Sequence, residues 1–262
     1  MFDLAALESA VTGTIFAGKL HFFAVTDSTN NDALEAARNA APHGSVYFAD
    51  EQLAGRGRGD HAWHSVAGEG LYMSVLLRPQ VPAARLPLLP LAAGLAAGEA
   101  ISAVTGLVVD LRWPNDLLIG PRKAGGILVE ARTEDSAVEF AVVGVGINVH
   151  QRRFDPGLST PGTSLDLEAG RRIPRQGLLV ALLESLEREA LALADAVATE
   201  TIPARVAADS SWVQGRSVEV HGPQACRGVT AGLDGNGFLR VQTNAGIVTV
   251  QTGGIRAAEM DR

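Results

Sequence analysis

The apolar and polar positions in the first hundred residues predict strands that alternate with helices. Three short apolar runs rich in β-branched and aromatic residues are predicted strands: 20–25, 45–50 and 70–77. Helices are predicted at 4–12 and at 83–104, where Pro87 and Pro90 lie near the start. Another helix opens at Thr29, which fits a capping box with Asp32.

From residue 108 onward the pattern becomes a series of short β-type runs separated by brief turns. The runs occupy 108–113, 117–119, 125–131 and 138–149. Because parallel crossovers need a dozen or more residues, turns this brief favour antiparallel neighbours. A long helix is predicted to follow at about 175–198, with Pro174 suited to its first turn.

The C-terminal segment, from about residue 212, has a different pattern of apolar and polar residues. Its strand-like runs are joined by Gly, Asn and Asp turns, and the stretch DGNG at 234–237 is a strong hairpin signal. This pattern predicts a small β-barrel that begins near residue 212. We therefore expect two domains, the larger over residues 1–210 and the smaller over residues 212–262.

The composition fits a packed globule. The chain has 262 residues, 47% of them hydrophobic, and a formal net charge of −7. This charge argues against a general nucleic-acid binder, because duplex binding needs many cations. Cys226 is the only cysteine, which excludes a disulfide framework. The start lacks a signal-peptide pattern and no uninterrupted apolar run reaches about 18 residues, so we expect a cytoplasmic protein without a membrane span.

A glycine-rich stretch, QLAGRGRGDHAW at 52–63, carries two arginines, Arg56 and Arg58. Its glycines leave backbone N–H groups free to turn toward an anion. If the stretch is extended, the two arginines project to one side and form a fork for phosphate or carboxylate. The alternative is a flexible, solvated loop in which the arginines are incidental.

A second candidate is the hairpin in the stretch RWPNDLLIGPRKAGGILVE at 112–130. Asp116 lies in its first turn, and Lys123 begins the next strand, close to Gly125 and Gly126. Asp116 and Lys123 are expected to face each other across the hairpin, and a ligand can approach the backbone closely at the two glycines. An ordinary hairpin with common turn residues is the alternative.

Four shorter stretches are weaker candidates. STN at 28–30 carries hydroxyl and amide groups at a strand–helix junction, where a plain N-cap is the alternative. GVGIN at 144–148 is typical of a strand end against which another group packs closely. GTIFAGKL at 13–20 lacks the Ser or Thr of a phosphate-binding loop, so we interpret it as a helix end and turn. His61 and His64 lack the acidic partner of a helical zinc motif.

Together these stretches, in this order, resemble the biotin–protein ligases. That family has a Ser-x-Asn-type segment after its first strand, a Q-x-A-G-R-G-R segment, a K-W-P-N-D turn, a lysine seven residues beyond the Asp, and a glycine-rich strand that ends in Asn. The corresponding stretches here are STN, QLAGRGR, RWPND, Lys123 and GVGIN. The resemblance covers nearly the whole chain.

The resemblance implies an α+β fold, in which a mixed β-sheet with helices, like that of class II aminoacyl-tRNA synthetases, precedes an SH3-like barrel. It also implies a two-step reaction. The carboxylate of biotin attacks the α-phosphate of ATP, which arrives with Mg²⁺, and the products are biotinyl-5′-AMP and pyrophosphate. A lysine of the biotin carboxyl carrier protein then displaces AMP. We expect a monomer or homodimer without a nucleic-acid or membrane partner.

The resemblance also assigns roles to individual residues. The biotin site is expected to comprise Ser28, Thr29, Asn30, Gln52, Arg56, Gly57, Arg58 and Lys123. The nucleotide site is expected to comprise Arg56, Arg58, Trp63, Lys123 and Asn148. The residues expected to act in catalysis are Lys123, Arg58 and Asp116. The glycine-rich loop is expected to close over the adenylate, and no residue is expected to bind a metal directly.

The chain departs from the family pattern at several positions. Asp60 and His61 replace a Gly and an Arg, and Arg112 replaces the Lys before Trp-Pro-Asn-Asp. Arg256 matches the family's C-terminal arginine only with a gap. About 20 residues precede the first predicted strand, too few for the N-terminal DNA-binding domain of some members, so we expect a ligase without repressor activity.

Two other functions are alternatives to biotin ligation. A lipoate or octanoyl ligase would share the fold, but the GRGR and STN segments favour biotin. A non-catalytic module would retain biotin or a nucleotide without reaction, whereas Lys123 together with both arginines favours chemistry.

Overall fold

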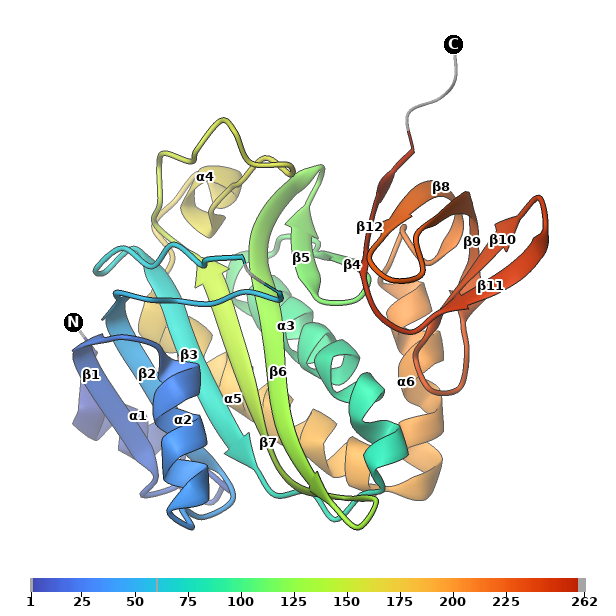
Figure 1. Cartoon of the computed structure of the whole chain (residues 1–262). Coiled ribbons are helices and arrows are strands. Elements are labelled where there is room, and N and C mark those ends of the chain that lie inside the picture. Colours follow the sequence, from blue (N-terminus) through green and yellow to red (C-terminus); the bar gives the residue numbers. More distant parts are fainter. Residues whose placement is uncertain (1, 60, 259–262) are drawn as a thin grey trace.

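A seven-stranded mixed β-sheet organises the chain in the computed structural model, which describes residues 2–59 and 61–258 (Figure 1). In spatial order its strands are β1 (Leu20–Thr26), β2 (Ser45–Gln52), β3 (Gly70–Leu77), β7 (Ala137–Asn148), β6 (Arg122–Glu134), β5 (Asp116–Ile119) and β4 (Asp110–Arg112). β1 and β2 are parallel, and all other neighbours in this sheet are antiparallel. The α+β fold with a mixed sheet is therefore confirmed, as are the antiparallel hairpins after residue 108.

Helices cover both faces of this sheet. On one face α2 (Thr29–Arg38) packs against β2, β3 and β7, and on the other α3 (Leu89–Thr105) and α5 (Arg175–Ala194) form the larger core (Figure 1). The short helix α1 (Leu4–Ala10) contacts α5. All 8 residues of β3 are buried. This central strand therefore has no solvent-facing side.

The predicted helix at 83–104 is a 3-10 turn, η1 (Ala83–Leu88), that continues into α3. Pro87 lies inside the turn and Pro90 at the start of α3, where a missing N–H costs no helical hydrogen bond. Among the described residues, Ala83–Thr105 is the one helix long and apolar enough to cross a membrane. Most of it is buried against α5 and the sheet, and a core helix has the same length and composition.

The capping box predicted for Thr29 with Asp32 is wrong. Ser28 is the N-cap residue of α2 and makes no side-chain cap hydrogen bond. The Asp32 carboxylate accepts a hydrogen bond from the hydroxyl of Thr26 instead. Thr29 is the first residue of α2, and its backbone N–H, which a capping box would pair with Asp32, donates to the side chain of Gln52 instead.

The single long helix predicted at 175–198 is two helices. α5 ends at Ala194, and α6 (Ala196–Ala208) begins after Asp195, whose backbone is extended. The Asp195 carboxylate accepts hydrogen bonds from two backbone N–H groups of the first turn of α6. An acidic N-cap of this kind stabilises a new helix start, which the apolar pattern alone did not reveal.

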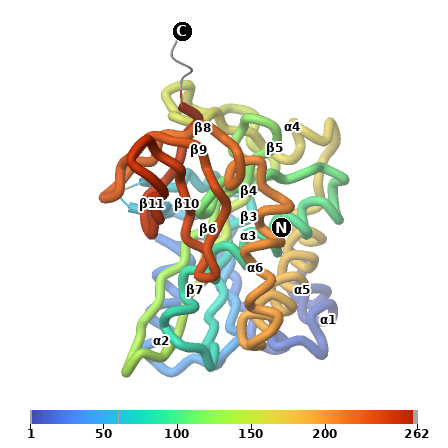
Figure 2. The backbone as a smooth tube through the Cα atoms, turned by 90° about the vertical axis from the view of Figure 1, so that its right-hand side faces the viewer, coloured from blue at the N-terminus to red at the C-terminus, as the bar shows by residue number. Residues whose placement is uncertain are grey.

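Five antiparallel strands form a second sheet near the C-terminus (Figure 2). Their order is β11 (Gly246–Val250), β10 (Leu239–Thr243), β9 (Cys226–Leu233), β8 (Gln214–His221) and β12 (Gly254–Ala257). The DGNG turn joins β9 to β10, as predicted. Within the described residues β11 and β12 do not pair with each other, so the sheet is open at its edges.

The two sheets are packed together. Apolar side chains of the second sheet belong to the same core cluster as those of α3 and the first sheet. The indole N–H of Trp113 donates to the carbonyl of Gly237 (3.1 Å), which ties the β4–β5 turn to the DGNG turn. The division into domains at residues 210–212 stays a prediction.

Candidate functional site

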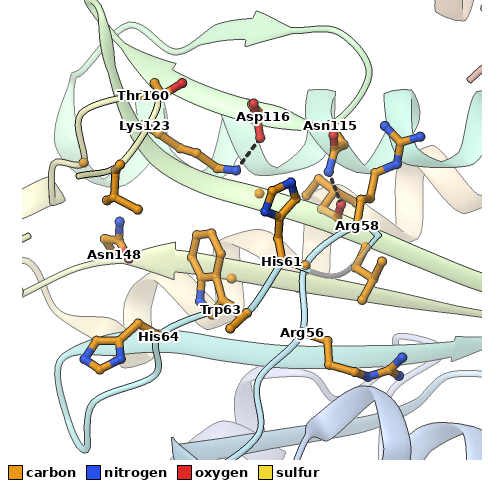
Figure 3. A pocket seen from close by; sticks show the side chains of 18 of the residues that line it. Arg56, Arg58, His61, Trp63, His64, Asn115, Asp116, Lys123, Asn148 and Thr160 are labelled. Carbon is orange, nitrogen blue, oxygen red and sulfur yellow. Dashed lines mark hydrogen bonds and ion pairs between the residues drawn. The ribbon is translucent and has the colours of Figure 1, made fainter. Parts of the chain in front are cut away.

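An open cleft of about 1460 Å³ lies at the edge of the first sheet where β2 and β7 end and β3 and β6 begin (Figure 3). Every residue that the sequence assigns to the site lines it: Ser28, Thr29, Asn30, Gln52, Arg56, Gly57, Arg58, Trp63, Asp116, Lys123 and Asn148. These residues come from five separate stretches of the chain. The fold therefore gathers them in one place, while the role of each stays a prediction.

Thr29, Asn30 and Gln52 form one wall of the cleft, and they hydrogen-bond to Ser65 and Ser74, which are buried behind them. We call these five uncharged residues the neutral wall. The amide oxygen of Gln52 accepts from the backbone N–H of Thr29 (2.9 Å), and its amide nitrogen donates to Ser65 Oγ (2.8 Å). The hydroxyls of Thr29 and Ser74 lie 2.8 Å apart, and Ser74 Oγ donates to Asn30 Oδ1 (2.6 Å). Mutual hydrogen bonds of this kind hold buried polar groups in one arrangement.

Two glycines of the GVGIN stretch let side chains approach β7 closely. A Cβ atom at Gly144 would lie 2.1 Å from Asn30 Oδ1, and one at Gly146 would lie 2.6 Å from the Trp63 ring. Both distances are far below van der Waals contact. The close packing that the sequence predicts for this strand end is therefore present, and its partners are Asn30 and Trp63.

The opposite wall carries charge, and we call it the charged wall (Arg112, Asp116 and Lys123). Lys123 Nζ lies 2.5 Å from Asp116 Oδ1, and Arg112 donates to Asp116 Oδ2 from Nη2 (2.6 Å) and Nε (3.0 Å). Lys123 and Asp116 thus face each other across the β5–β6 hairpin, as the sequence predicts (Figure 3). Burial disfavours the ionised form of Asp116, but the two cations outweigh it and lower the pKa of this carboxyl.

The glycine-rich loop folds back as a small hairpin over the cleft. The backbone N–H of Gly57 donates to the carbonyl of His61 (2.7 Å), and the backbones of Arg56 and Ala62 form an isolated antiparallel β-bridge. Asp60 lies outside the described residues. The described residues on either side of it, 55–57 and 61–63, are therefore paired with each other.

The two arginines of this loop do not form the fork predicted for an extended stretch. The guanidinium of Arg56 pairs with Glu130 of β6 (2.6 Å) and with Asn31, whereas that of Arg58 donates to the carbonyl of Gly253 (2.7 Å). Figure 3 shows their side chains diverging, because the turn of the hairpin breaks the alternation expected of a strand. Burial lowers the pKa of Arg58, and the charge of Asp116 opposes that effect.

Trp63 and Asn148 lie on the floor between the two walls. Lys123 Nζ lies 5.6 Å from the centre of the Trp63 ring, within the range of a cation–π contact. The indole nitrogen of Trp63 is buried and has no hydrogen-bond partner in the described residues. The side chain of Asn148 donates to the carbonyl of Thr163 (3.0 Å), which holds the segment after β7 against the cleft.

Several residues that line the cleft or support it were not found in the sequence. Ser74 and Glu130 are polar residues within apolar strand runs, and this contrast is the signal that could have identified them. The segment 151–160, which lies between β7 and α4 (Leu165–Ala169), gave no signal because its composition is that of an ordinary loop. Arg256 of β12 also lines the cleft.

The structure places two of the weaker motifs. Lys19, in the stretch GTIFAGKL, donates to the carbonyls of Ile15 and His43, and the stretch is a turn that leads into β1. His61 and His64 line the cleft. Within residues 2–59 and 61–258, no group of three His, Cys, Asp or Glu side chains is placed to hold a metal ion.

Comparison with known proteins identifies the class. The profile of the Biotin/lipoate A/B protein ligase family matches residues 22–148. The biotin–acetyl-CoA-carboxylase ligase of Mycobacterium tuberculosis is 35% identical over 246 residues, 90% of this chain and 88% of that protein. The chain belongs to the biotin–protein ligases.

Two further relatives show how far the similarity extends. The bifunctional ligase/repressor BirA of Bacillus spizizenii is 41% identical over 166 residues, which are 63% of this chain and 51% of that protein. The match therefore spans about half the length of that relative. The biotin protein ligase of Aquifex aeolicus, solved with biotin and ATP, has a TM-score of 0.78 and 27% identity, covering 91% of this chain and 98% of the other.

Proposed function

We propose that this chain activates biotin with ATP and transfers it to a protein. The carboxylate of biotin attacks the α-phosphate of ATP, which gives biotinyl-5′-AMP and pyrophosphate. The amine of a lysine in the biotin carrier domain of acetyl-CoA carboxylase then attacks the acyl carbon and displaces AMP. The names of the relatives, and the biotin and ATP bound to the Aquifex aeolicus enzyme, support this reaction.

The observation that carries the proposal is the presence of both walls in one cleft. The neutral wall offers uncharged donors and acceptors, which suit the ureido ring of biotin. The charged wall offers Lys123 and Arg112, which suit a carboxylate and a phosphate that meet. A molecule that spans the cleft therefore meets hydrogen-bonding groups at one end and positive charge at the other.

Fixed cations at the charged wall favour the transition state of adenylation. Negative charge gathers where the biotin carboxylate meets the α-phosphate, and Lys123 is the residue that we assign to this point. The loss of one such preorganised group from an active site costs about 3–4 kcal/mol. The adjacent Asp116 holds the ammonium group in place through the ion pair across the hairpin.

The hairpin of the glycine-rich loop is proposed to shield the adenylate from water. Arg58→Ala is expected to raise the release of biotinyl-5′-AMP into solution several-fold, since the loop loses its hydrogen bond to Gly253. Measurement of free biotinyl-5′-AMP during turnover tests this. If the Arg58→Ala protein retains biotinyl-5′-AMP and transfers biotin as wild type does, the loop does not shield the adenylate.

Other features of the proposal concern the substrates and the assembly. Mg²⁺ enters as MgATP, bound through phosphate oxygens. The antiparallel order of the second sheet supports an SH3-like module, and the mixed sheet with its helices supports a relation to class II aminoacyl-tRNA synthetases. A cytoplasmic monomer or homodimer without nucleic acid or membrane partners stays a prediction.

The direct test is a transfer assay. The purified protein is mixed with biotin, MgATP and a biotin carrier domain, and the mass of the carrier is measured. A gain equal to one biotin, less water, is expected, and it should be absent without ATP. Parallel reactions with octanoate and lipoate test the rival ligase on the same fold. Binding of biotin without any transfer would overturn the enzymatic proposal.

A further inference from the structure

Glu130 of β6 connects the neutral wall to the glycine-rich loop. Its Oε2 accepts hydrogen bonds from the amide nitrogen of Asn30 (2.9 Å) and from Nη2 of Arg56 (2.6 Å), and its Oε1 accepts from Nη1 of Arg56 (3.0 Å). The side chain is 27% exposed. One half-buried carboxylate therefore contacts two residues that the sequence assigns to biotin.

The carboxylate fixes which way the amide of Asn30 points. An ionised carboxylate can only accept hydrogen bonds, so the nitrogen of Asn30 must face Glu130. The oxygen of the same amide then faces Ser74, whose hydroxyl lies 2.6 Å away. Ser74 has one proton, and it must lie on this bond because the Asn30 oxygen has none to give.

The direction of the Ser74 hydrogen bond also determines the direction of the bond between Thr29 and Ser74. Two hydroxyl oxygens 2.8 Å apart need a proton between them, and the proton of Ser74 is already committed to Asn30. Thr29 must therefore donate to Ser74. Its oxygen has no proton left for the amide oxygen of Gln52, which lies 3.1 Å away.

Gln52 is fixed from its other end. Its nitrogen donates to Ser65 Oγ (2.8 Å), and the Ser65 hydroxyl can in turn donate to the carbonyl of Trp63 (3.3 Å). The amide oxygen of Gln52 thus faces Thr29. The neutral wall presents two acceptor oxygens side by side, those of Thr29 and Gln52, with no proton between them, and this pair suits an N–H donor on a ligand.

We propose that Glu130 is a positioning residue that sets the direction of every hydrogen bond from Asn30 to Thr29, and thereby prepares the wall to accept an N–H group. The inference rests on the proposed function, because the ureido ring of biotin supplies N–H donors. Without an acceptor at position 130, the Asn30 nitrogen keeps only the carbonyl of Leu128, which at 3.5 Å is at the limit of a hydrogen bond, so the amide can reverse. Ser74 then turns its proton toward Thr29, and the Thr29 proton turns toward Gln52 or the ligand.

The test compares three variants by calorimetric binding of biotin without ATP. Glu130→Met removes both acceptor oxygens and is expected to raise the Kd for biotin about tenfold, the effect of one lost hydrogen bond of about 1.4 kcal/mol. Glu130→Gln is compared in an Arg56→Met protein, because its amide nitrogen would otherwise face the Nη1 donor of Arg56. There it keeps one oxygen for Asn30, so its Kd should stay within about threefold of that of the Arg56→Met protein. Glu139→Met, which breaks the Arg132–Glu139 pair on the same β6–β7 hairpin, is the matched control and should leave the Kd unchanged.

Two backgrounds separate this role from an effect on the loop. If Glu130 acts through the chain of hydrogen bonds, Glu130→Met should raise the Kd for biotin by the same factor in an Arg56→Met protein as in wild type. In a Ser74→Ala protein it should not raise the Kd any further. Circular dichroism checks that each variant is folded. If Glu130→Met does not fold, Ser74→Ala replaces it as the test, and this variant should itself bind biotin more weakly than wild type.

The proposal is overturned if Glu130→Met binds biotin as wild type does. It is also overturned if, in the Arg56→Met protein, Glu130→Gln is as weak as Glu130→Met, because charge rather than acceptor geometry would then be the cause. Failure of the wild-type protein to bind biotin would contradict the proposed function as well, and the wild-type titration reveals this before any variant is compared.

Discussion

The neutral wall and the charged wall hold their groups in place by different means. The neutral wall is a chain of short hydrogen bonds among uncharged side chains, most of them buried. The charged wall depends on one carboxylate, Asp116, between Lys123 and Arg112. A ligand at the neutral wall meets groups that are already oriented, whereas an anion at the charged wall competes with Asp116 for its cations. Changes at the charged wall should therefore affect chemistry, and changes at the neutral wall should affect binding.

The largest effect is expected for Lys123→Ala. Loss of the ammonium group should lower the rate of adenylation several-hundred-fold, in line with about 3–4 kcal/mol for one preorganised group. Biotin-dependent pyrophosphate release measures this step. The control is Arg122→Ala, at the position next to Lys123. This change removes the ion pair between Arg122 and Glu168 and should keep the wild-type rate. A small effect of Lys123→Ala would mean that the charged wall does not take part in the chemistry.

A smaller loss is expected for Asp116→Asn. The amide keeps the shape of the carboxyl but removes the charge that holds Lys123 and Arg112, so we expect kcat to fall about ten- to thirtyfold. The KM for biotin should change little, because the neutral wall remains intact. Steady-state kinetics at saturating ATP separate the two constants. A rise in the KM for biotin as large as the fall in kcat would show that the two walls are not independent.

A still smaller, purely binding effect is expected for Thr29→Val. This isosteric change removes the hydroxyl that bonds Ser74, leaves a buried polar partner unsatisfied, and should raise the Kd for biotin about tenfold at most. The Kd for ATP should not change. Thr105→Val, at the far end of α3, provides a control for the loss of a threonine hydroxyl. Loss of ATP binding in Thr29→Val would contradict the division between the walls.

The smallest effect concerns acid stability. Because the folded pKa of Asp116 is lowered, its ionised form stabilises the fold above the unfolded pKa of about 3.9, and this contribution disappears as pH falls through the folded value. Urea unfolding should show wild type more stable than Asp116→Asn between pH 5 and 7. The difference should shrink below about pH 4. A difference that is constant down to pH 2 would exclude ionisation of Asp116 as its cause.

The sequence predicted the main sheet and the composition of the cleft, because motifs at strand ends carry both. The residues from Ser28 to Asn148 that it assigned to the site all line one cleft. It did not predict that Arg56 and Arg58 diverge, since that depends on a hairpin whose register is set by tertiary contacts. It also missed Glu130 and Ser74, whose importance comes from neighbours far away in sequence.

The hydrogen bond between Arg58 and Gly253 joins residues 195 positions apart. On the ribosome, the arginine is made long before its partner carbonyl exists. The strands of the first sheet are complete once residue 148 has left the exit tunnel, and at that stage Arg56 can already pair with Glu130. The contact of Arg58 forms only later, once Gly253 has also emerged. An incompletely translated copy that lacks Gly253 therefore leaves Arg58 without this attachment, and the cleft of such a copy stays less protected.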